Sequence, residues 1–186
     1  MQARGPIDIV VEKDKIVKII NVGYPGIDIK KNRRPVLQKG GKEINADGMF
    51  LLPGFIDMHG HIGGVAQGAD WEYVFKLWLA HGVTTVREPS GRGIDYALDL
   101  KRRAKNNEII APRIIAYSRF GEGSIKEINS VEEAINWVQL NKKNGADGIK
   151  FFGAEPKIMA AALKENNRLG LGSACHHAQL SVAKWN

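Results

Sequence analysis

Two histidines separated by one glycine, His59-Gly60-His61, are the residues of this sequence best suited to chemistry. They close an apolar run, residues 54–59, that predicts a β-strand. Residues two apart in a strand point the same way, so a strand continued through Gly60 would place both imidazoles on one face. Neighbouring imidazoles suit Zn²⁺ or a similar borderline metal. Taken alone, the pattern fits a pair of surface histidines in a glycine-rich turn equally well.

Two later strands also end in side chains that can bind a metal. Lys150 lies in the predicted strand 149–152, and His176-His177 end the predicted strand 173–177. Alternation places Gly148, Lys150 and Phe152 on one face of the first of these strands. A buried lysine loses its proton readily, and only the neutral amine reacts with carbon dioxide. Strand parity does not decide between His176 and His177.

These side chains belong to a region in which strands and helices alternate. Further strands are predicted at 83–87 and 113–117, with helices at 70–81, 94–105, about 131–143 and from Pro156 onward. Such repeats predict a parallel sheet with right-handed crossovers. Five strands fit either an open doubly wound sheet or the first part of an eight-stranded barrel. No glycine-rich nucleotide loop follows the first strand, which disfavours dinucleotide binding.

The first 52 residues have a different pattern, with short strands and turns. Runs at 7–11 and 16–20 predict a hairpin, and residues 22–41 predict a loop rich in Gly, Pro and charge. Strand character is predicted to resume over 44–52 around a turn at Asp47-Gly48. The sequence therefore divides into a small β module at 1–52 and an α/β region at 53–186.

Composition narrows the classes of function. The formal net charge is +7, but the basic residues are scattered and no interleaved aromatic motif accompanies them, so we expect no nucleic-acid partner. The sequence contains no run of about 20 apolar residues, so it predicts no membrane span. The single cysteine, Cys175, excludes an internal disulfide framework and favours a cytoplasmic, reducing location.

The segment Leu-Pro-Gly-Phe-Ile-Asp-Met-His-Gly-His at 52–61 resembles the first barrel strand of the amidohydrolase superfamily, in its imidazolonepropionase- and prolidase-like branch. Residues 45–50, 8–12, 15–19 and 82–87 resemble other parts of that family, so the resemblance covers nearly the whole chain. It implies an α/β fold: a partial (β/α)8 TIM-type barrel of about five strands at 53–186, preceded by part of a β-sandwich at 1–52.

The resemblance also implies a site and an activity. His59, His61, Lys150 and His176 would hold one or two divalent metals, with zinc expected and Lys150 carboxylated. The implied reaction is hydrolysis of an amide-type C–N bond in a small molecule, for instance a dipeptide or cyclic amide. The family's general-base aspartate is expected beyond Asn186, and a full-length form could be a homo-oligomer. We therefore expect a truncated product without turnover of its own.

Three alternatives stay open at this stage. The chain could be an inactive metal-binding form of such an enzyme. It could be an open α/β enzyme that uses its histidines differently, in which case Lys150 would lie far from His59. It could also be a basic binding module.

Overall fold

The computed structural model describes residues 5–24, 26–27, 31–63, 68–89, 91 and 93–176. His177 lies outside the described residues, so the structure does not compare it with His176. The chain forms two compact units, Met1–Leu51 and Leu52–Asn186, here termed the first and second unit.

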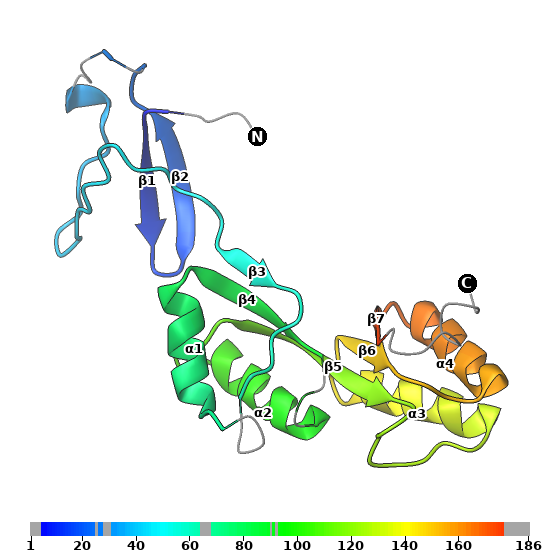
Figure 1. Cartoon of the computed structure of the whole chain (residues 1–186). Coiled ribbons are helices and arrows are strands. Elements are labelled where there is room, and N and C mark those ends of the chain that lie inside the picture. The colour runs from blue at the N-terminus through cyan, green and yellow to red at the C-terminus, as the bar shows by residue number, and fades with distance from the viewer. Residues whose placement is uncertain are drawn as a thin grey trace. The chain divides into compact units, whose positions relative to one another are not determined.

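The first unit contains an antiparallel hairpin of β1 (Ile7–Glu12) and β2 (Lys15–Asn21), with Glu12 opposite Lys15 at the turn (Figure 1). A short 3-10 helix, η1 (Lys31–Arg33), follows, and the guanidinium of Arg34 donates two 2.8 Å hydrogen bonds to the Asp8 carboxylate. The predicted turn at Asp47-Gly48 is confirmed. The strand character predicted over 44–52 is wrong: these residues form no strand and pair with none. Their apolar side chains are exposed, so burial does not favour an extended ladder there.

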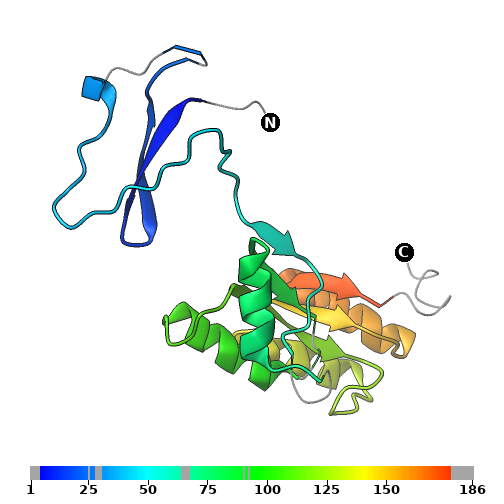
Figure 2. The same cartoon turned by 60° about the vertical axis from the view of Figure 1, so that its left-hand side comes forward.

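The second unit is a five-stranded sheet in the order β3-β4-β5-β6-β7, in which every neighbouring pair is parallel. The strands are β3 (Phe55–Asp57), β4 (Val83–Glu88), β5 (Arg113–Phe120), β6 (Gly148–Phe151) and β7 (Gly172–Cys175). Helices α1 (Trp71–Ala80), α2 (Ile94–Lys105), α3 (Val131–Lys143) and α4 (Pro156–Arg168) connect them in turn, as Figure 2 shows. A doubly wound sheet reverses its strand order at a switch point, whereas this sheet keeps sequence order throughout. The fold is therefore the partial TIM-type barrel that the sequence predicts.

The helices begin where their capping residues predict. The Asp70 side chain accepts from the backbone N–H of Glu72, and Ser130 accepts from that of Glu133. Pro156 occupies the first turn of α4, where its missing N–H costs nothing. These features fix where α1, α3 and α4 begin, and so where the loops that follow the carboxyl ends of β3, β5 and β6 end.

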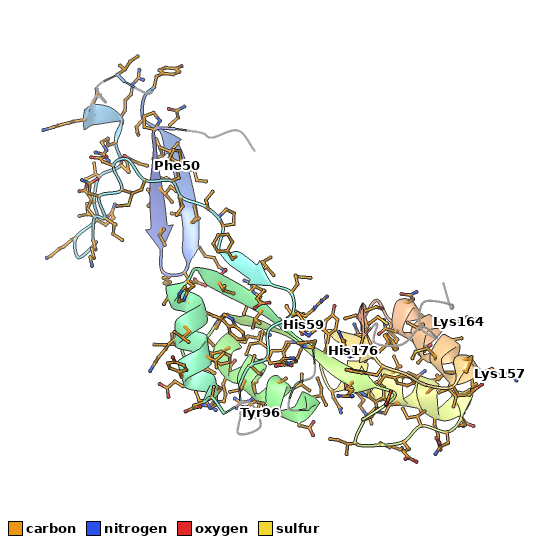
Figure 3. The ribbon with its side chains drawn as sticks, in the orientation of Figure 1. Phe50, His59, Tyr96, Lys157, Lys164 and His176 are labelled. Carbon is orange, nitrogen blue, oxygen red and sulfur yellow. The ribbon has the colours of Figure 1, made fainter. Side chains whose placement is uncertain are left out.

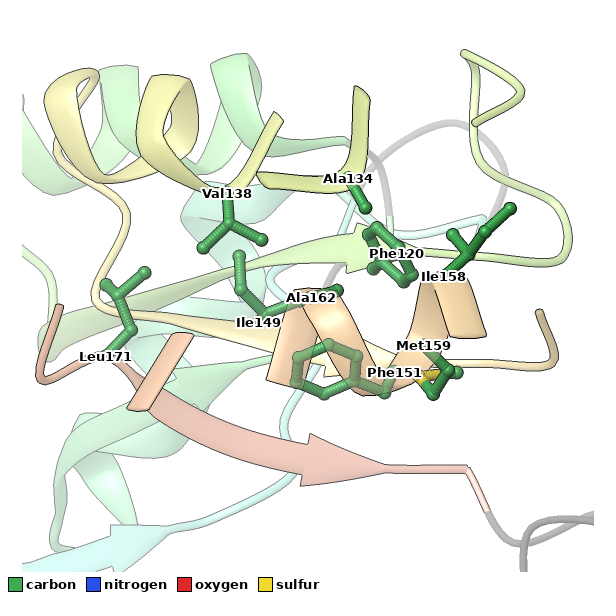
Figure 4. Packing of buried hydrophobic residues seen from close by; sticks show 9 residues of the cluster. All are labelled: Phe120, Ala134, Val138, Ile149, Phe151, Ile158, Met159, Ala162 and Leu171. Carbon is green, nitrogen blue, oxygen red and sulfur yellow. The ribbon is translucent and has the colours of Figure 1, made fainter. Parts of the chain in front are cut away.

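Apolar side chains fill the space between the sheet and its helices. Around α3 and α4 the buried cluster consists of Phe120, Ala134, Val138, Ile149, Phe151, Ile158, Met159, Ala162 and Leu171 (Figure 4). A second cluster, which includes Phe75, Val86 and Leu100, lies around α1 and α2. Ile149 and Phe151 thus face the helices, and alternation turns Gly148 and Lys150 to the other face, here termed the inner face.

The inner face is layered across strands. Strand pairing aligns Tyr117 with Gly148 and Gly172, and then Arg119 with Lys150 and Ala174. A Cβ atom on Gly172 would lie 1.9 Å from the Tyr117 hydroxyl oxygen, and one on Gly148 would lie 2.4 Å from the Tyr117 ring. The Tyr117 side chain therefore fills the space left by two glycines, directly below the Arg119–Lys150 layer.

No helix in the described part of the chain is both long enough and apolar enough to cross a membrane.

Candidate metal centre

A cavity of about 290 Å³ lies at the carboxyl ends of the strands of the second unit. It is lined by His59, His61, Pro89, Gly91, Arg119, Lys150, Phe152 and His176. Figure 3 labels His59 and His176, which come from opposite edges of the sheet. The structure thus brings together all four residues predicted from the sequence as metal ligands. Since Lys150 and His59 share this cavity, the open α/β alternative is disfavoured.

The two histidines of the His59-Gly60-His61 segment follow β3 rather than lying within it, because the strand ends at Asp57. The Asp57 carboxylate accepts a hydrogen bond from the backbone N–H of His59 at 2.9 Å, which closes a tight turn. A Cβ atom on Gly60 would lie 2.6 Å from both Trp78 and Val86. Only glycine lets the backbone approach β4 this closely, and the two imidazoles end with ring centroids 5.5 Å apart and nearly perpendicular planes.

Glu88, at the end of β4, positions the His61 ring. Its side chain is only 2% exposed, and its Oε1 lies 3.1 Å from His61 Nδ1. The same carboxylate accepts from the backbone N–H groups of Ile62, at 2.7 Å, and Gly91. With Nδ1 donating to Glu88, His61 Nε2 keeps its lone pair, which is the arrangement that a carboxylate gives a metal-binding histidine.

Lys150 lies on the inner face of β6 and is 4% exposed. Its Nζ donates to the Cys175 carbonyl oxygen at 3.1 Å. Burial lowers the pKa of Lys150, and the nearby charge of Arg87 lowers that pKa further. Burial, followed by the charge of Lys150, also lowers the pKa of His59. Both shifts favour neutral nitrogen donors, the form that can bind a metal or, for lysine, react with carbon dioxide.

His176 follows β7 and stacks on Phe152, with ring centroids 4.9 Å apart and planes 21° apart. Its backbone N–H donates to the Phe151 carbonyl at 3.0 Å, which continues the β6–β7 ladder by one residue. The Cys175 thiol is unpaired and partly buried. His176 therefore reaches the cavity, and Phe152 holds its ring there.

No protein-family model matches the chain. Two relatives do: the adenine deaminases of Bacillus velezensis and Bacillus subtilis are 31% and 34% identical to it over 116 residues. Each alignment covers 56% of this chain but 20% of the relative. These matches accompany a cavity lined by the residues that carry the sequence resemblance. Over these 116 residues the chain is thus similar to enzymes of the amidohydrolase superfamily.

Solved structures support the partial-barrel fold. A crystal structure described as a "putative prolidase", from Bifidobacterium longum, superposes with a TM-score of 0.58 and 24% identity, covering 72% of this chain and 37% of that one. The bottromycin amidohydrolase gives a TM-score of 0.55 and 23% identity, covering 70% of this chain and 30% of that one. At these identities the likeness concerns the fold. The chain spans well under half the length of each protein it matches.

The amidohydrolase superfamily implies a divalent metal, and the cavity offers a donor set that fits one. Two imidazoles, one of them oriented by a buried carboxylate, and an amine biased towards its neutral form suit a borderline ion such as Zn²⁺. Within the described residues, no three His, Cys, Asp or Glu side chains gather into a metal-binding cluster. The assignment of His59, His61, Lys150 and His176 as ligands therefore remains a prediction.

Two residues of this candidate site are absent from the sequence prediction. Glu88 acts across 27 positions on His61, and Arg119 reaches the cavity from the end of β5. The sequence carries a signal for Glu88, which is an acidic residue directly after the predicted strand 83–87 and before Pro89. Arg119 gave none, because the prediction ended its strand at 117, whereas β5 extends to Phe120.

Proposed function

We propose that this site contributes to metal-dependent hydrolysis of a C–N bond in a small molecule. The supporting observation is the convergence of His59, His61, Lys150 and His176 on one cavity at the carboxyl ends of parallel strands. In barrels of this kind, active sites occupy that end. The relatives and fold neighbours act, by their names, on C–N bonds, which agrees with this class of reaction.

In the proposed site, His59, His61 and His176 supply imidazole nitrogens and Lys150 supplies an amine or, after reaction with carbon dioxide, a carbamate. A divalent ion held there would polarise the scissile group and favour ionisation of the attacking water. Glu88 keeps His61 in the tautomer whose Nε2 faces a ligand. We assign no general base among the described residues, because no aspartate or glutamate lines the cavity.

Two substrate classes follow from different observations. The sequence resemblance favours an amide, either a dipeptide or a cyclic amide. The identity of 31–34% to adenine deaminases favours an aminopurine as the second candidate. We further propose a cytoplasmic location, since a single cysteine fits a reducing compartment.

Metal binding tests the proposal most directly. The full chain, stripped with chelator and dialysed against Zn²⁺ or Mn²⁺, is expected to retain metal, measured by elemental analysis. His59→Ala and His176→Ala should each lower the affinity sharply, whereas His177→Ala should lower it much less, because register with the resembled family favours His176 and adjacent residues of an extended chain face opposite ways. His81→Ala is the matched control, since His81 caps α1 by a 2.8 Å contact with the Leu77 carbonyl.

Equal metal retention in all four variants would contradict the assignment of these histidines as ligands. If His177→Ala loses more metal affinity than His176→Ala, the ligand that follows the fifth strand is His177 rather than His176. Metal-loaded protein is then assayed for ammonia release from adenine and for cleavage of dipeptides and cyclic amides. Turnover of neither class by a metal-loaded, longer form of the protein contradicts the proposed activity.

A further inference from the structure

Among the described residues that line the cavity, Arg119 is the one arginine. Strand pairing sets it directly opposite Lys150, so both side chains rise from the same layer of the inner face. It therefore lies beside the predicted metal ligands but is not one of them, because a guanidinium stays protonated and has no free lone pair.

Neighbouring groups hold the Arg119 side chain in place. Its guanidinium carbon lies 3.7 Å from the centroid of the Phe152 ring, and its Nε donates to the Glu122 carbonyl at 2.9 Å. Gly123 makes room for it, since a Cβ atom there would lie 2.5 Å from a terminal nitrogen of Arg119. A guanidinium fixed in this way loses little conformational freedom when it binds a ligand.

The donors of Arg119 are left for a ligand. Within the described residues its terminal nitrogens form no hydrogen bond, and no carboxylate lies within ion-pair distance. The described residues of the cavity lining include Arg119 and Lys150 but no carboxylate. Glu88, a buried acid at the end of β4, is engaged by His61, Ile62 and Gly91.

A purely structural role for Arg119 is the simpler alternative, since arginine stems often pack on aromatic rings at a surface. Such a role accounts for the contact with Phe152 but not for the position in the cavity. Arg119 is held by its Nε and one face, and its outer nitrogens pair with none of the residues that the structure describes. This is the geometry in which arginine binds a carboxylate through two parallel hydrogen bonds.

We propose that Arg119 forms a subsite for a carboxylate group of the substrate. This inference rests on the proposed function and sharpens it: the hydrolysed molecule is an acylated amino acid, a dipeptide or a cyclic amide that carries a carboxylate close to the scissile C–N bond. A neutral aminopurine gains nothing from the subsite. Arg119 thus selects the first substrate class over the second.

The test compares two ligands that differ only in charge, N-acetylglycine and N-acetylglycinamide. Their dissociation constants for the metal-free full chain are measured by ligand-observed NMR titration, so that neither metal nor turnover is needed. The wild-type protein is expected to bind the acid about 10- to 100-fold more tightly than the amide, the range of a charge-assisted pair of hydrogen bonds. Arg119→Gln should bring this ratio close to one, and Arg119→Lys should leave it severalfold below wild type, because an ammonium does not present a planar fork.

Arg113→Gln is the matched control, since it removes the same charge from the exposed amino-terminal end of the same strand. It should leave the ratio unchanged. A wild-type ratio near one, an unaltered ratio in Arg119→Gln, or equal weakening of both ligands in that variant overturns the subsite. If circular dichroism shows that Arg119→Gln does not fold, Arg119→Lys decides, and a wild-type ratio in it overturns the proposal. Failure of the proposed function would instead appear as loss of metal binding or turnover with the acid–amide ratio intact.

Discussion

Phe50 in the first unit and Phe120 in the second are the same residue type in opposite environments, 82% and 0% exposed. Phe120 ends a strand that is paired on both sides and contacts Trp137 from α3 and Phe151 from β6. Among the described residues of the first unit, the hairpin pairs with no further strand, and the apolar side chains Val11, Ile16 and Ile19 remain exposed. A β-ribbon buries its apolar face only when a second layer covers it. In the second unit four helices cover the five-stranded sheet.

The largest effect expected from this difference is on stability. Phe120→Ala should lower the free energy of unfolding of the second unit by about 3–5 kcal/mol, through lost burial and the cavity left behind. Phe50→Ala, the matched change in the first unit, should alter stability by no more than about 0.5 kcal/mol. Urea unfolding followed by circular dichroism, to which both units contribute, measures both. Comparable losses in the two variants would show that Phe50 is buried in solution and remove the contrast.

A second experiment asks whether polar groups in the second unit are as constrained as its core. Glu88→Gln should weaken metal binding by about 10- to 100-fold, because the amide no longer holds His61 as a charged acceptor. Glu108→Gln serves as the control, since Glu108 is exposed and pairs with Arg102. Zinc titration with a competing chelator gives both affinities. Equal affinities for the two variants would mean that Glu88 supports the fold alone.

The smallest effect concerns acid stability. Hydrogen bonds from Arg168 and then from Gln139 lower the pKa of Glu165 to about 2, against an ordinary value of 4.5. A carboxylate with a depressed pKa stabilises the folded state above its unfolded pKa and ceases to do so as the pH falls through the folded value. Glu165→Gln should therefore be less stable than wild type near pH 6, and the difference should shrink between pH 4.5 and about 2.

Unfolding of the second unit as a function of pH checks this. Asp8→Asn, which breaks the ion pair with Arg34 in the first unit, should leave that profile unchanged. A constant gap between wild type and Glu165→Gln across the acid range would contradict the shifted pKa. A change of profile in Asp8→Asn would show that the two units do not unfold independently.

Much of the second unit could be predicted from its sequence because its signals are local. Helices α2 and α3 match their predicted ranges, and Ser130 caps α3 as its spacing from Glu133 indicates. The prediction failed where structure depends on distant partners. Residues 44–52 have strand-like composition but no neighbouring strand, and β3 stops at Asp57 because the carboxylate of that residue turns the chain before His59.

The residues of the candidate site also differ in whether their sequence signals are local or depend on distant contacts. His59, His61, Lys150 and His176 carry sequence signals because each lies at a strand end with a distinctive neighbourhood. Glu88 and Arg119 act through contacts with residues 27 and 33 positions away, His61 and Phe152, which no local window contains. Their roles become visible only when strand register is known.

The layer of Tyr117, Gly148 and Gly172 has a consequence for how this protein can vary. One ring occupies the space of three side chains, so the three positions form a single unit of variation. A larger residue at 148 or 172 requires a shorter one at 117 in the same sequence, and related chains should show the three changing together. The same layer is the floor beneath Arg119 and Lys150, so such a joint exchange would also reset the depth of the cavity and the size of molecule that it admits.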